Sequence, residues 1–232
     1  SADQKFLCEN ACASAGSCEF FGTSGTMQLL TEAIGMALPG AALRPQHLFQ
    51  MTRGCRDAGR RISALVRDGL TPDKIITAKS IHNALVVHAA AGGSTNVLLH
   101  LPALAREIGV ELSLDTIADI NNRTPFLLNA RPSGEHANSH VWYAGGAYAL
   151  MREIQDLLHL DAMTVTGRTL GENLAVLETD GYFKNMPRWL ENFRLRKEDV
   201  IRPRSSPLAP RGAIAILRGN IAPKGAVVKR SA

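Results

Sequence analysis

Residues 8–40 read CENACASAGSCEFFGTSGTMQLLTEAIGMALPG, and this stretch joins three cysteines to the start of a helix. Apolar residues recur at spacings of three and four, which predicts a helix that begins at Thr23 or Thr26 and ends before Pro39. Its expected buried face consists of Met27, Leu30, Ile34 and Leu38. Cys18 precedes this helix, where the macrodipole and the free backbone N–H groups favour a thiolate. A thiolate binds metals or attacks electrophiles, but small buried residues in a tight turn explain each cysteine equally well.

The composition is that of a globular protein and argues against several other classes of protein. The chain has 232 residues, a net charge of +5 and 45% hydrophobic residues, which is typical of a globular protein with a sizeable core. Its basic residues are scattered, which argues against a nucleic-acid interface. Neither a signal peptide nor a run of 18 apolar residues is present, so we expect a cytoplasmic protein with no membrane partner. The cysteine content favours a metal or redox role in a reducing compartment over a disulfide scaffold.

The rest of the chain is rich in helical patterns. Periodicity and capping signals predict helices over residues 48–66, 73–90, 113–120 and 144–158, and another after a capping box formed by Thr169 and Glu172. Cys55 lies on an apolar stripe and is predicted to be a core residue. His82 and His88 are six residues apart, a spacing that does not place two ligands on one helix face, so both are interpreted as structural.

A glycine-rich turn at residues 92–96, GGSTN, separates two of these helices. Ser94 can cap the second helix, and the N–H groups of the turn could hold an anion such as a carboxylate. An ordinary helix–helix turn is the favoured interpretation from these residues alone. After residue 180 the periodicity weakens, and residues 212–232 are β-branched and glycine-spaced, which predicts the first strands of a β domain.

Five segments together resemble one protein family, and they follow that family's order from residue 8 to residue 229. They are SCEFFGTSGTMQ (17–28), EAIGMALPG (32–40), HAAAGGSTN (88–96), DAMTVTGRTLGENL (161–174) and GNIAPKGAVVK (219–229). The family is that of the dihydroxy-acid and phosphogluconate dehydratases. The longer segments HAAAGGSTNVLLHLPALA and LHLDAMTVTGRTLGENL most resemble the branch that acts on aldonates such as D-xylonate.

The resemblance implies an α/β protein more than twice this length. Residues 1–200 would be a helix-rich part of an N-terminal iron–sulfur domain, 201–211 a proline-rich linker and 212–232 the start of a C-terminal β-barrel-like domain. The reaction implied is a hydro-lyase reaction that turns a sugar acid into a 2-keto-3-deoxy acid. An iron–sulfur cluster, [2Fe–2S] rather than [4Fe–4S], would act as Lewis acid for the C3 hydroxyl, and Mg²⁺ would hold the carboxylate and the enolate.

Carried over to this chain, the resemblance assigns the third cluster cysteine to Cys18. The other two cysteines and the catalytic serine base are expected outside residues 1–232, so this segment by itself should neither assemble the cluster stably nor turn over substrate. The resemblance also raises the expectation that the 92–96 turn, with Ser94, Thr95 and Asn96, contacts substrate, together with His140. Members of the family are usually homodimers or homotetramers.

Other interpretations remain at this point. The substrate could instead be a dihydroxy acid or 6-phosphogluconate. A non-enzymatic alternative is a binding module in which Cys8, Cys12 and Cys18 form a metal or redox-sensing site. The spacing of these cysteines matches no established zinc or iron–sulfur pattern, and no fourth ligand is evident. The resemblance places no cluster ligand at Cys8 or Cys12, so both are interpreted as local, structural thiols.

Overall fold

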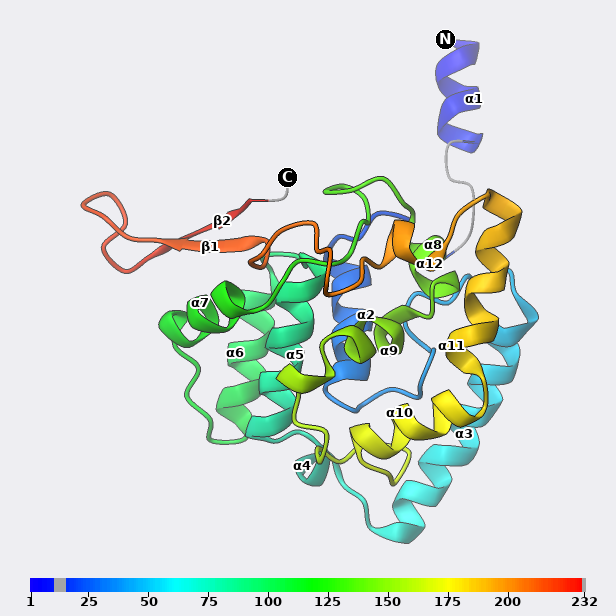
Figure 1. The fold of residues 1–232 in the computed structure, drawn as a ribbon, viewed down its shortest axis with the longest axis horizontal. Helices are drawn as coiled ribbons and strands as arrows, with labels where there is room; N and C mark the ends of the chain where they lie inside the picture. Colours follow the sequence, from blue (N-terminus) through cyan, green and yellow to red (C-terminus); the bar gives the residue numbers. More distant parts are fainter. Residues whose placement is uncertain (11–15, 231–232) are drawn as a thin grey trace.

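The computed structural model describes residues 1–10 and 16–230, and Figure 1 shows a helical body from which a β-hairpin protrudes. The helices are α1 (Ala2–Asn10), α2 (Thr23–Ala33), α3 (Phe49–Asp68), α4 (Pro72–Ile75), α5 (Ala78–Ala91), α6 (Val97–Glu107), α7 (Leu114–Arg123), α8 (Asn138–Tyr143), α9 (Gly146–Glu153), α10 (Leu170–Thr179), α11 (Tyr182–Asn185) and α12 (Lys197–Val200), with 3₁₀ helices η1 (Gln155–Leu157) and η2 (Met186–Phe193). The strands β1 (Ile214–Leu217) and β2 (Ala226–Lys229) pair antiparallel.

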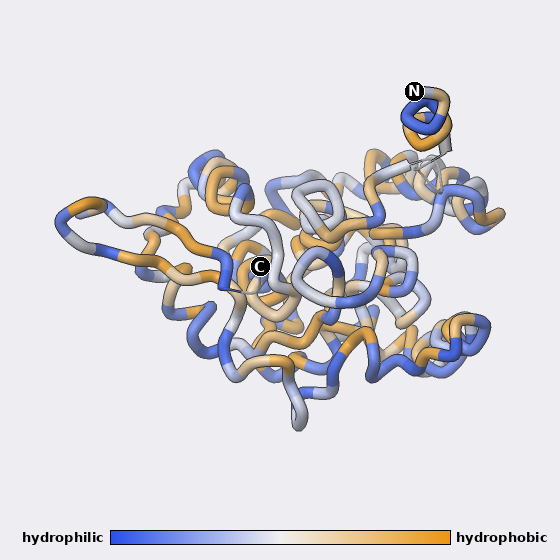
Figure 2. The backbone as a smooth tube through the Cα atoms, turned by 90° about the horizontal axis from the view of Figure 1, so that it is seen from above, coloured by the Kyte–Doolittle hydropathy of each residue, from blue (hydrophilic) through white to orange (hydrophobic). Residues whose placement is uncertain are grey.

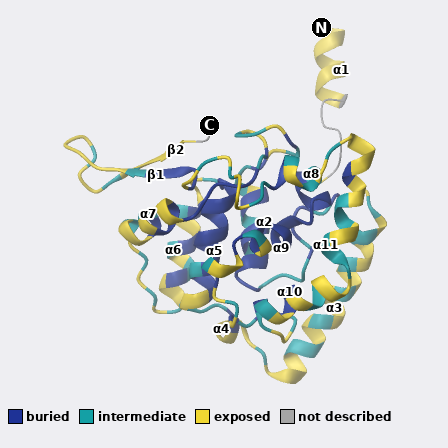
Figure 3. Cartoon of the chain, viewed as in Figure 1, coloured by how far each residue is buried: buried dark blue, intermediate teal, exposed yellow. Residues whose placement is uncertain are grey.

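The core lies where α2, α5 and α9 pack together at the centre of the body (Figure 3). Leu29 and Leu30 of α2, Ala84 and Val87 of α5 and Leu150 of α9 are fully buried. The small alanines of α5 allow neighbouring helices to approach closely, and the apolar area they remove from water stabilises the fold. The described residues are rich in helices and contain a two-stranded sheet, which confirms the predicted α/β class.

The helix after the cysteine stretch is shorter than its apolar pattern predicts. Helix α2 ends at Ala33, because Gly35 adopts a φ of 89° and turns the chain away from the helix axis. A Cβ atom at this glycine would lie 2.7 Å from the carbonyl oxygen of Met163, so the turn also requires the absence of a side chain. Leu30 and Ile34 are buried as expected, whereas Leu38 is only partly buried.

Two other predicted helices are each divided. The pattern over residues 73–90 forms α4 and α5, and Thr77 caps α5 through a capping box with Ser80. The pattern over residues 144–158 forms two helices, α9 and η1. A further helix, α8, precedes them and begins at Asn138, before the predicted start. Gly145 has a φ of 103° between α8 and α9, so the chain changes direction where the sequence suggested a single helix start.

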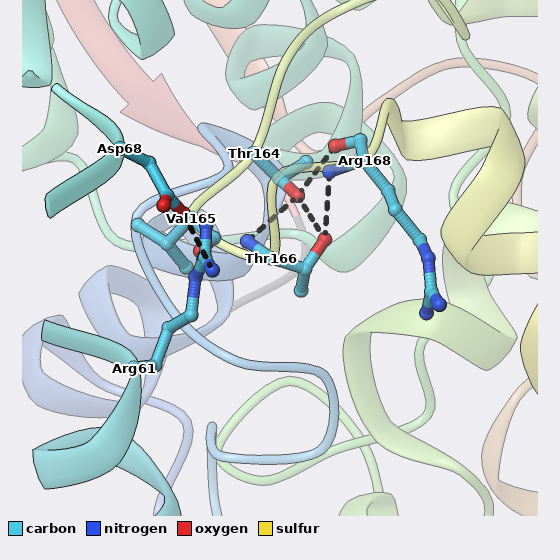
Figure 4. Close-up of polar contacts among 6 residues, drawn as sticks. All are labelled: Arg61, Asp68, Thr164, Val165, Thr166 and Arg168. Atoms are coloured by element: carbon cyan, nitrogen blue, oxygen red, sulfur yellow. Dashed lines mark hydrogen bonds and ion pairs between the residues drawn. The ribbon is translucent and has the colours of Figure 1, made fainter. Parts of the chain in front are cut away.

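Helix α3 lies at the periphery, and the prediction that Cys55 is a core residue is wrong. Cys55 is exposed, and no residue of α3 is buried. The apolar side of α3 instead borders a surface groove of about 790 Å³ opposite residues 36–41. Arg61 fastens the helix to the body by donating from Nε to the carbonyl oxygen of Val165, and it also pairs with Asp68 (Figure 4).

The segment after residue 180 contains more structure than its composition suggested. Residues 182–200 form α11, η2 and α12, because Leu190 and Val200 are fully buried against the body. The following residues run beside the extended stretch at 126–130, with bridges from Leu128 to Ile201 and from Phe126 to Ala209. The division into domains at 201–211 remains a prediction.

The β-hairpin extends away from the helices, as the tube in Figure 2 also shows. Ile214 pairs with Lys229 and Leu217 with Ala226, and the connecting loop carries the nearly fully exposed Ile221. Asn121 of α7 fixes the base of the hairpin, since its Oδ1 accepts the N–H of Ile214. Within residues 1–10 and 16–230, no helix combines the length and the apolar character that crossing a membrane requires.

Candidate functional site

Cys18 lies in the loop that leads into α2, and its side chain is exposed. The backbone N–H of Phe20 points to its Sγ atom at 3.4 Å. Phe21, which is buried, anchors the end of the loop and donates from its N–H to the carbonyl oxygen of Arg131 at 2.6 Å. An exposed sulfur at this position can act as a soft metal ligand, so Cys18 fits one ligand position of an iron–sulfur cluster.

The start of α8 holds this loop from the other side. The Nδ2 atom of Asn138 donates to the carbonyl oxygens of Cys18 at 2.8 Å and Phe20 at 2.9 Å. The carboxylate of Glu19 accepts hydrogen bonds from the backbone N–H of Ser139 at 3.1 Å and from its hydroxyl at 2.9 Å. The cysteine loop is therefore fixed by residues about 120 positions later in the chain.

The predicted 92–96 turn contacts the first turn of α2. The hydroxyls of Ser94 and Thr23 lie 3.1 Å apart, and Asn96 donates from Nδ2 to the Thr23 hydroxyl at 2.7 Å. The N–H of Ser94 donates to the hydroxyl of Thr26 at 3.0 Å. Because Thr23 is five positions after Cys18, the turn and the cysteine are attached to the same short segment. Thr95 is exposed on the outside of the turn.

The residue that caps α6 is not the predicted one. Ser94 does not cap α6 in the predicted way; the N-cap residue is Asn96, and its side chain makes no capping hydrogen bond. The Ser94 hydroxyl instead accepts the N–H of Asn96 at 3.3 Å and meets Thr23. The side chains of Ser94 and Asn96 thus contact Thr23 of α2, and a small network of hydroxyl and amide groups joins the N-termini of α2 and α6.

His88 is hydrogen-bonded to the backbone of the 92–96 turn. Its side chain is buried, and its Nε2 atom donates to the carbonyl oxygen of Ser94 at 3.0 Å. Burial lowers the pKa of His88 to about 4, so the imidazole is neutral at physiological pH and acts as a hydrogen-bond donor. This position agrees with the structural role predicted for His88. His82 lies beside His159, and burial lowers its pKa as well.

His140 lies on α8, next to the residues that hold the cysteine loop. Its ring contacts those of His136 and Phe193, at centroid distances of 5.9 and 4.6 Å. Burial lowers the pKa of His140, and the Glu19 carboxylate opposes this effect. The Nδ1 atom is buried without a partner among the described residues. His140 therefore shares the neighbourhood of the Cys18 loop and keeps one uncommitted ring nitrogen.

The structure thus brings Ser94 and Asn96 into contact with Thr23, five residues after Cys18, and places His140 on the helix whose first residues hold the Cys18 loop. Thr95 is exposed and does not join these contacts. Sequence reasoning missed Glu19, Thr23, Asn138 and Ser139. Glu19 and Thr23 stand within the quoted motif and could have been considered, but no local signal marks Asn138. Cys12 lies outside the described residues, and Cys8 is exposed on α1. Across residues 1–10 and 16–230, no three His, Cys, Asp or Glu side chains are grouped so as to hold a metal ion.

Comparisons with known proteins agree with the motifs. Residues 1–173 match the family model "Dihydroxy-acid/6-phosphogluconate dehydratase N-terminal", and residues 199–232 match its C-terminal counterpart. The chain is 43% identical to a dihydroxy-acid dehydratase of Caldicellulosiruptor bescii over 226 residues, 97% of this chain and 38% of that protein. It is also 43% identical to dihydroxy-acid dehydratase 1 of Methanosarcina acetivorans over 231 residues, 100% of this chain and 40% of that protein.

The chain therefore spans about two fifths of the length of these curated relatives. The matches run through both models in the order in which the motifs occur, and they include the loop with Cys18 and the 92–96 turn. The resemblance seen in the motifs is confirmed at the level of the family. With a family model covering most of its length and relatives above 40% identity, this chain belongs to the dihydroxy-acid/6-phosphogluconate dehydratase family.

Proposed function

We propose that residues 1–232 are part of a hydro-lyase that removes water from a 2,3-dihydroxy acid and gives a 2-keto acid. Membership of the family supports this reaction. The observation that carries it in this chain is an exposed thiol just ahead of α2, on the same short segment as the hydroxyl and amide groups of the 92–96 turn. The remaining cluster ligands and the catalytic base belong to parts of the protein outside this chain.

In this proposal Cys18 binds one iron of an iron–sulfur cluster. When bound, the cluster and Mg²⁺ supply Lewis acids for the departing C3 hydroxyl and for the substrate carboxylate with its developing enolate. The chain's own residues bind and orient the substrate. Ser94, Thr95 and Asn96 present polar groups at the N-terminus of α6, where the helix dipole favours a carboxylate. His140, on the helix that holds the Cys18 loop, contacts the substrate from the side of α8 in this proposal.

The proposed substrate is an aldonate such as D-xylonate, as the motifs around residues 88–105 and 158–174 suggest. The relatives named dihydroxy-acid dehydratase support a dihydroxy acid about equally well. The complete product of the reading frame that contains this chain should therefore be assayed for keto-acid release with D-xylonate, a branched 2,3-dihydroxy acid and 6-phosphogluconate. The highest kcat/KM identifies the substrate class, and activity with none of the three would contradict the proposed reaction.

The role of Cys18 is tested with three matched cysteine variants of that complete protein. Cys18→Ser should lose the visible absorbance of the cluster and the keto-acid release. Cys55→Ser and Cys8→Ser also replace exposed cysteines, and they should retain both. Loss of bound metal in Cys8→Ser would favour the alternative site built from Cys8, Cys12 and Cys18. Full absorbance in Cys18→Ser would remove Cys18 from the cluster.

The type of the cluster and the oligomeric state of the complete protein are tested by separate measurements. The cluster is proposed to be [2Fe–2S] rather than [4Fe–4S], which iron and sulfide analysis with Mössbauer spectroscopy distinguishes. The complete protein is proposed to be a homodimer or a homotetramer, and light scattering coupled to size exclusion reports its mass. A monomer at micromolar concentration would contradict the second point.

A further inference from the structure

Asn138 makes an unusual set of hydrogen bonds with the loop that carries Cys18. Its Nδ2 atom donates to the carbonyl oxygens of Cys18 and Phe20, and its backbone N–H donates to the carbonyl oxygen of Glu19 at 2.9 Å. A single residue thus binds three consecutive carbonyl groups. Asn138 is only 4% exposed, and these bonds satisfy its Nδ2 atom, whereas its Oδ1 atom is buried without a hydrogen-bond partner among the described residues.

The loop has few other restraints. Cys18 and Phe20 are exposed, and only Phe21 at the end of the loop belongs to the core. A loop without apolar burial depends on its hydrogen bonds for a defined conformation. Ser139 adds to the same restraint, since its N–H and hydroxyl both bind the Glu19 carboxylate.

The first turn of α2 leaves space for the Asn138 amide. A Cβ atom built on Gly25 would lie 2.8 Å from Asn138 Nδ2, so any larger residue here would displace the amide. The bond pattern also requires a donor, because the group faces two carbonyl oxygens. An aspartate of the same shape would place carboxylate oxygens against them.

We propose that Asn138 is a positioning residue for Cys18: it fixes the backbone of the loop so that the sulfur is held at its ligand position. The inference rests on the proposed function, in which Cys18 binds the cluster. A metal ligand must be held to within about 0.5 Å of its productive geometry, and supporting hydrogen bonds supply that precision. Asn138 acts through the backbone and touches neither substrate nor the reacting atoms.

The test compares Asn138→Ala with Asn83→Ala in the complete protein. Asn83 is a matched control, because it is also fully buried and its side chain also binds the backbone of a loop, at His159. In the cluster-free protein, hydrogen–deuterium exchange of the peptide that covers residues 18–22 measures how often the loop opens, because the N–H groups of Phe21 and Gly22 are hydrogen-bonded in the closed loop. The peptide that covers α3 is the internal reference. Removal of two hydrogen bonds should increase the opening of the loop roughly tenfold.

We therefore expect residues 18–22 in Asn138→Ala to exchange several-fold faster relative to α3, and the rate ratio in Asn83→Ala to stay within twofold of the parent protein. In the loaded enzyme, Asn138→Ala should release iron to a chelator about tenfold faster and alter the electron paramagnetic resonance signal of the reduced cluster. Equal exchange ratios and equal release rates in Asn138→Ala and Asn83→Ala would overturn the inference.

A second variant covers the case in which Asn138→Ala does not fold. Gly25→Ala retains the amide but displaces it, and alanine is favoured over glycine within a helix. It should also accelerate exchange of residues 18–22, and an unchanged ratio would count against the inference. The outcomes distinguish the two proposals. A parent protein that binds no cluster contradicts the proposed function, whereas the exchange ratio of the cluster-free protein still decides whether Asn138 restrains the loop.

Discussion

The carboxylate of Glu32 accepts the backbone N–H of Ala42 at 2.6 Å, although the two residues are separated by a turn of the chain. Glu32 is buried in α2, and the backbone N–H groups of Gly40 and Ala41 also stabilise its ionised form. Burial has the larger effect and raises the pKa of Glu32 to about 7. Tyr148 and Tyr182 face the same carboxylate, and the pKa values of both are raised by burial and by its charge.

Glu32 should give the stability of the chain a distinct pH dependence. Between its ordinary pKa of 4.5 and its folded value of about 7, the folded chain binds a proton that the unfolded chain lacks. Its contribution to the free energy of unfolding is therefore largest below pH 4.5 and is lost as the pH rises through 7. Relative to Glu32→Gln, which stays neutral, this contribution should decrease by on the order of 3 kcal/mol between pH 4.5 and 8.

Urea unfolding at pH 4.5, 6 and 8 measures this difference. Glu111→Gln is the control, because Glu111 is exposed and its substitution should leave the pH dependence unchanged. A difference between the parent chain and Glu32→Gln that stays constant across this range would show that Glu32 titrates alike in the folded and unfolded chain.

His88 should give the free energy of unfolding the opposite pH dependence, so that stability increases as the pH rises. Its folded pKa of about 4 lies below its ordinary value of 6.5, so the unfolded chain binds the additional proton in this interval. The stability that neutral His88 contributes is present above pH 6.5 and is lost as the pH falls through 4, by on the order of 3 kcal/mol. His88→Gln should unfold with a flatter dependence between pH 6.5 and 4. The exposed His47 provides the control His47→Gln, and identical curves for the parent chain and His88→Gln would refute the prediction.

Replacing two glycines by alanine should change the free energy of unfolding in opposite directions. A Cβ atom on Gly93 would lie 2.4 Å from Cδ2 of His88 and 2.7 Å from Cγ2 of Thr26, both buried side chains. Gly93→Ala should cost about 1–3 kcal/mol through overpacking. Gly59 lies within α3 and its Cβ would meet nothing within 4 Å, so Gly59→Ala should add about 0.5–1 kcal/mol. Thermal unfolding checks both, and a stabilised Gly93→Ala variant would contradict the close packing of the turn.

Arg61 should control how firmly α3 is attached. Its guanidinium reaches from α3 to the Val165 carbonyl, whereas the neighbouring Arg60 pairs with Asp57 on the same helix. Because no residue of α3 is buried, loss of the Arg61 contact should increase amide hydrogen exchange across residues 49–68 about fivefold or more. Arg60→Ala should leave the exchange within twofold of the parent chain. Equal exchange in both variants would indicate that packing alone holds the helix.

Local patterns in the sequence predicted the capping of several elements correctly. The capping box of Thr169 and Glu172 starts α10, Ser113 caps α7, and Gly69 ends α3 in a left-handed conformation. Each of these features depends on groups within one turn of a helix, so neighbouring residues suffice to specify it. The exposure of Cys55 was not predictable in this way, because an apolar stripe indicates a face that needs a partner but does not identify one.

The sequence by itself determined the family, the helix-rich character of the chain and the position of Cys18 ahead of a helix. Only the tertiary structure decided which residues surround that cysteine. Asn138 meets Cys18 across 120 residues, and Ser94 meets Thr23 across 71. Such contacts follow from the packing of α2, α5 and α9, which fixes where each helix begins in space. No local period or spacing encodes that relation, because a hydrogen bond between distant segments forms only after the core has brought their backbones together.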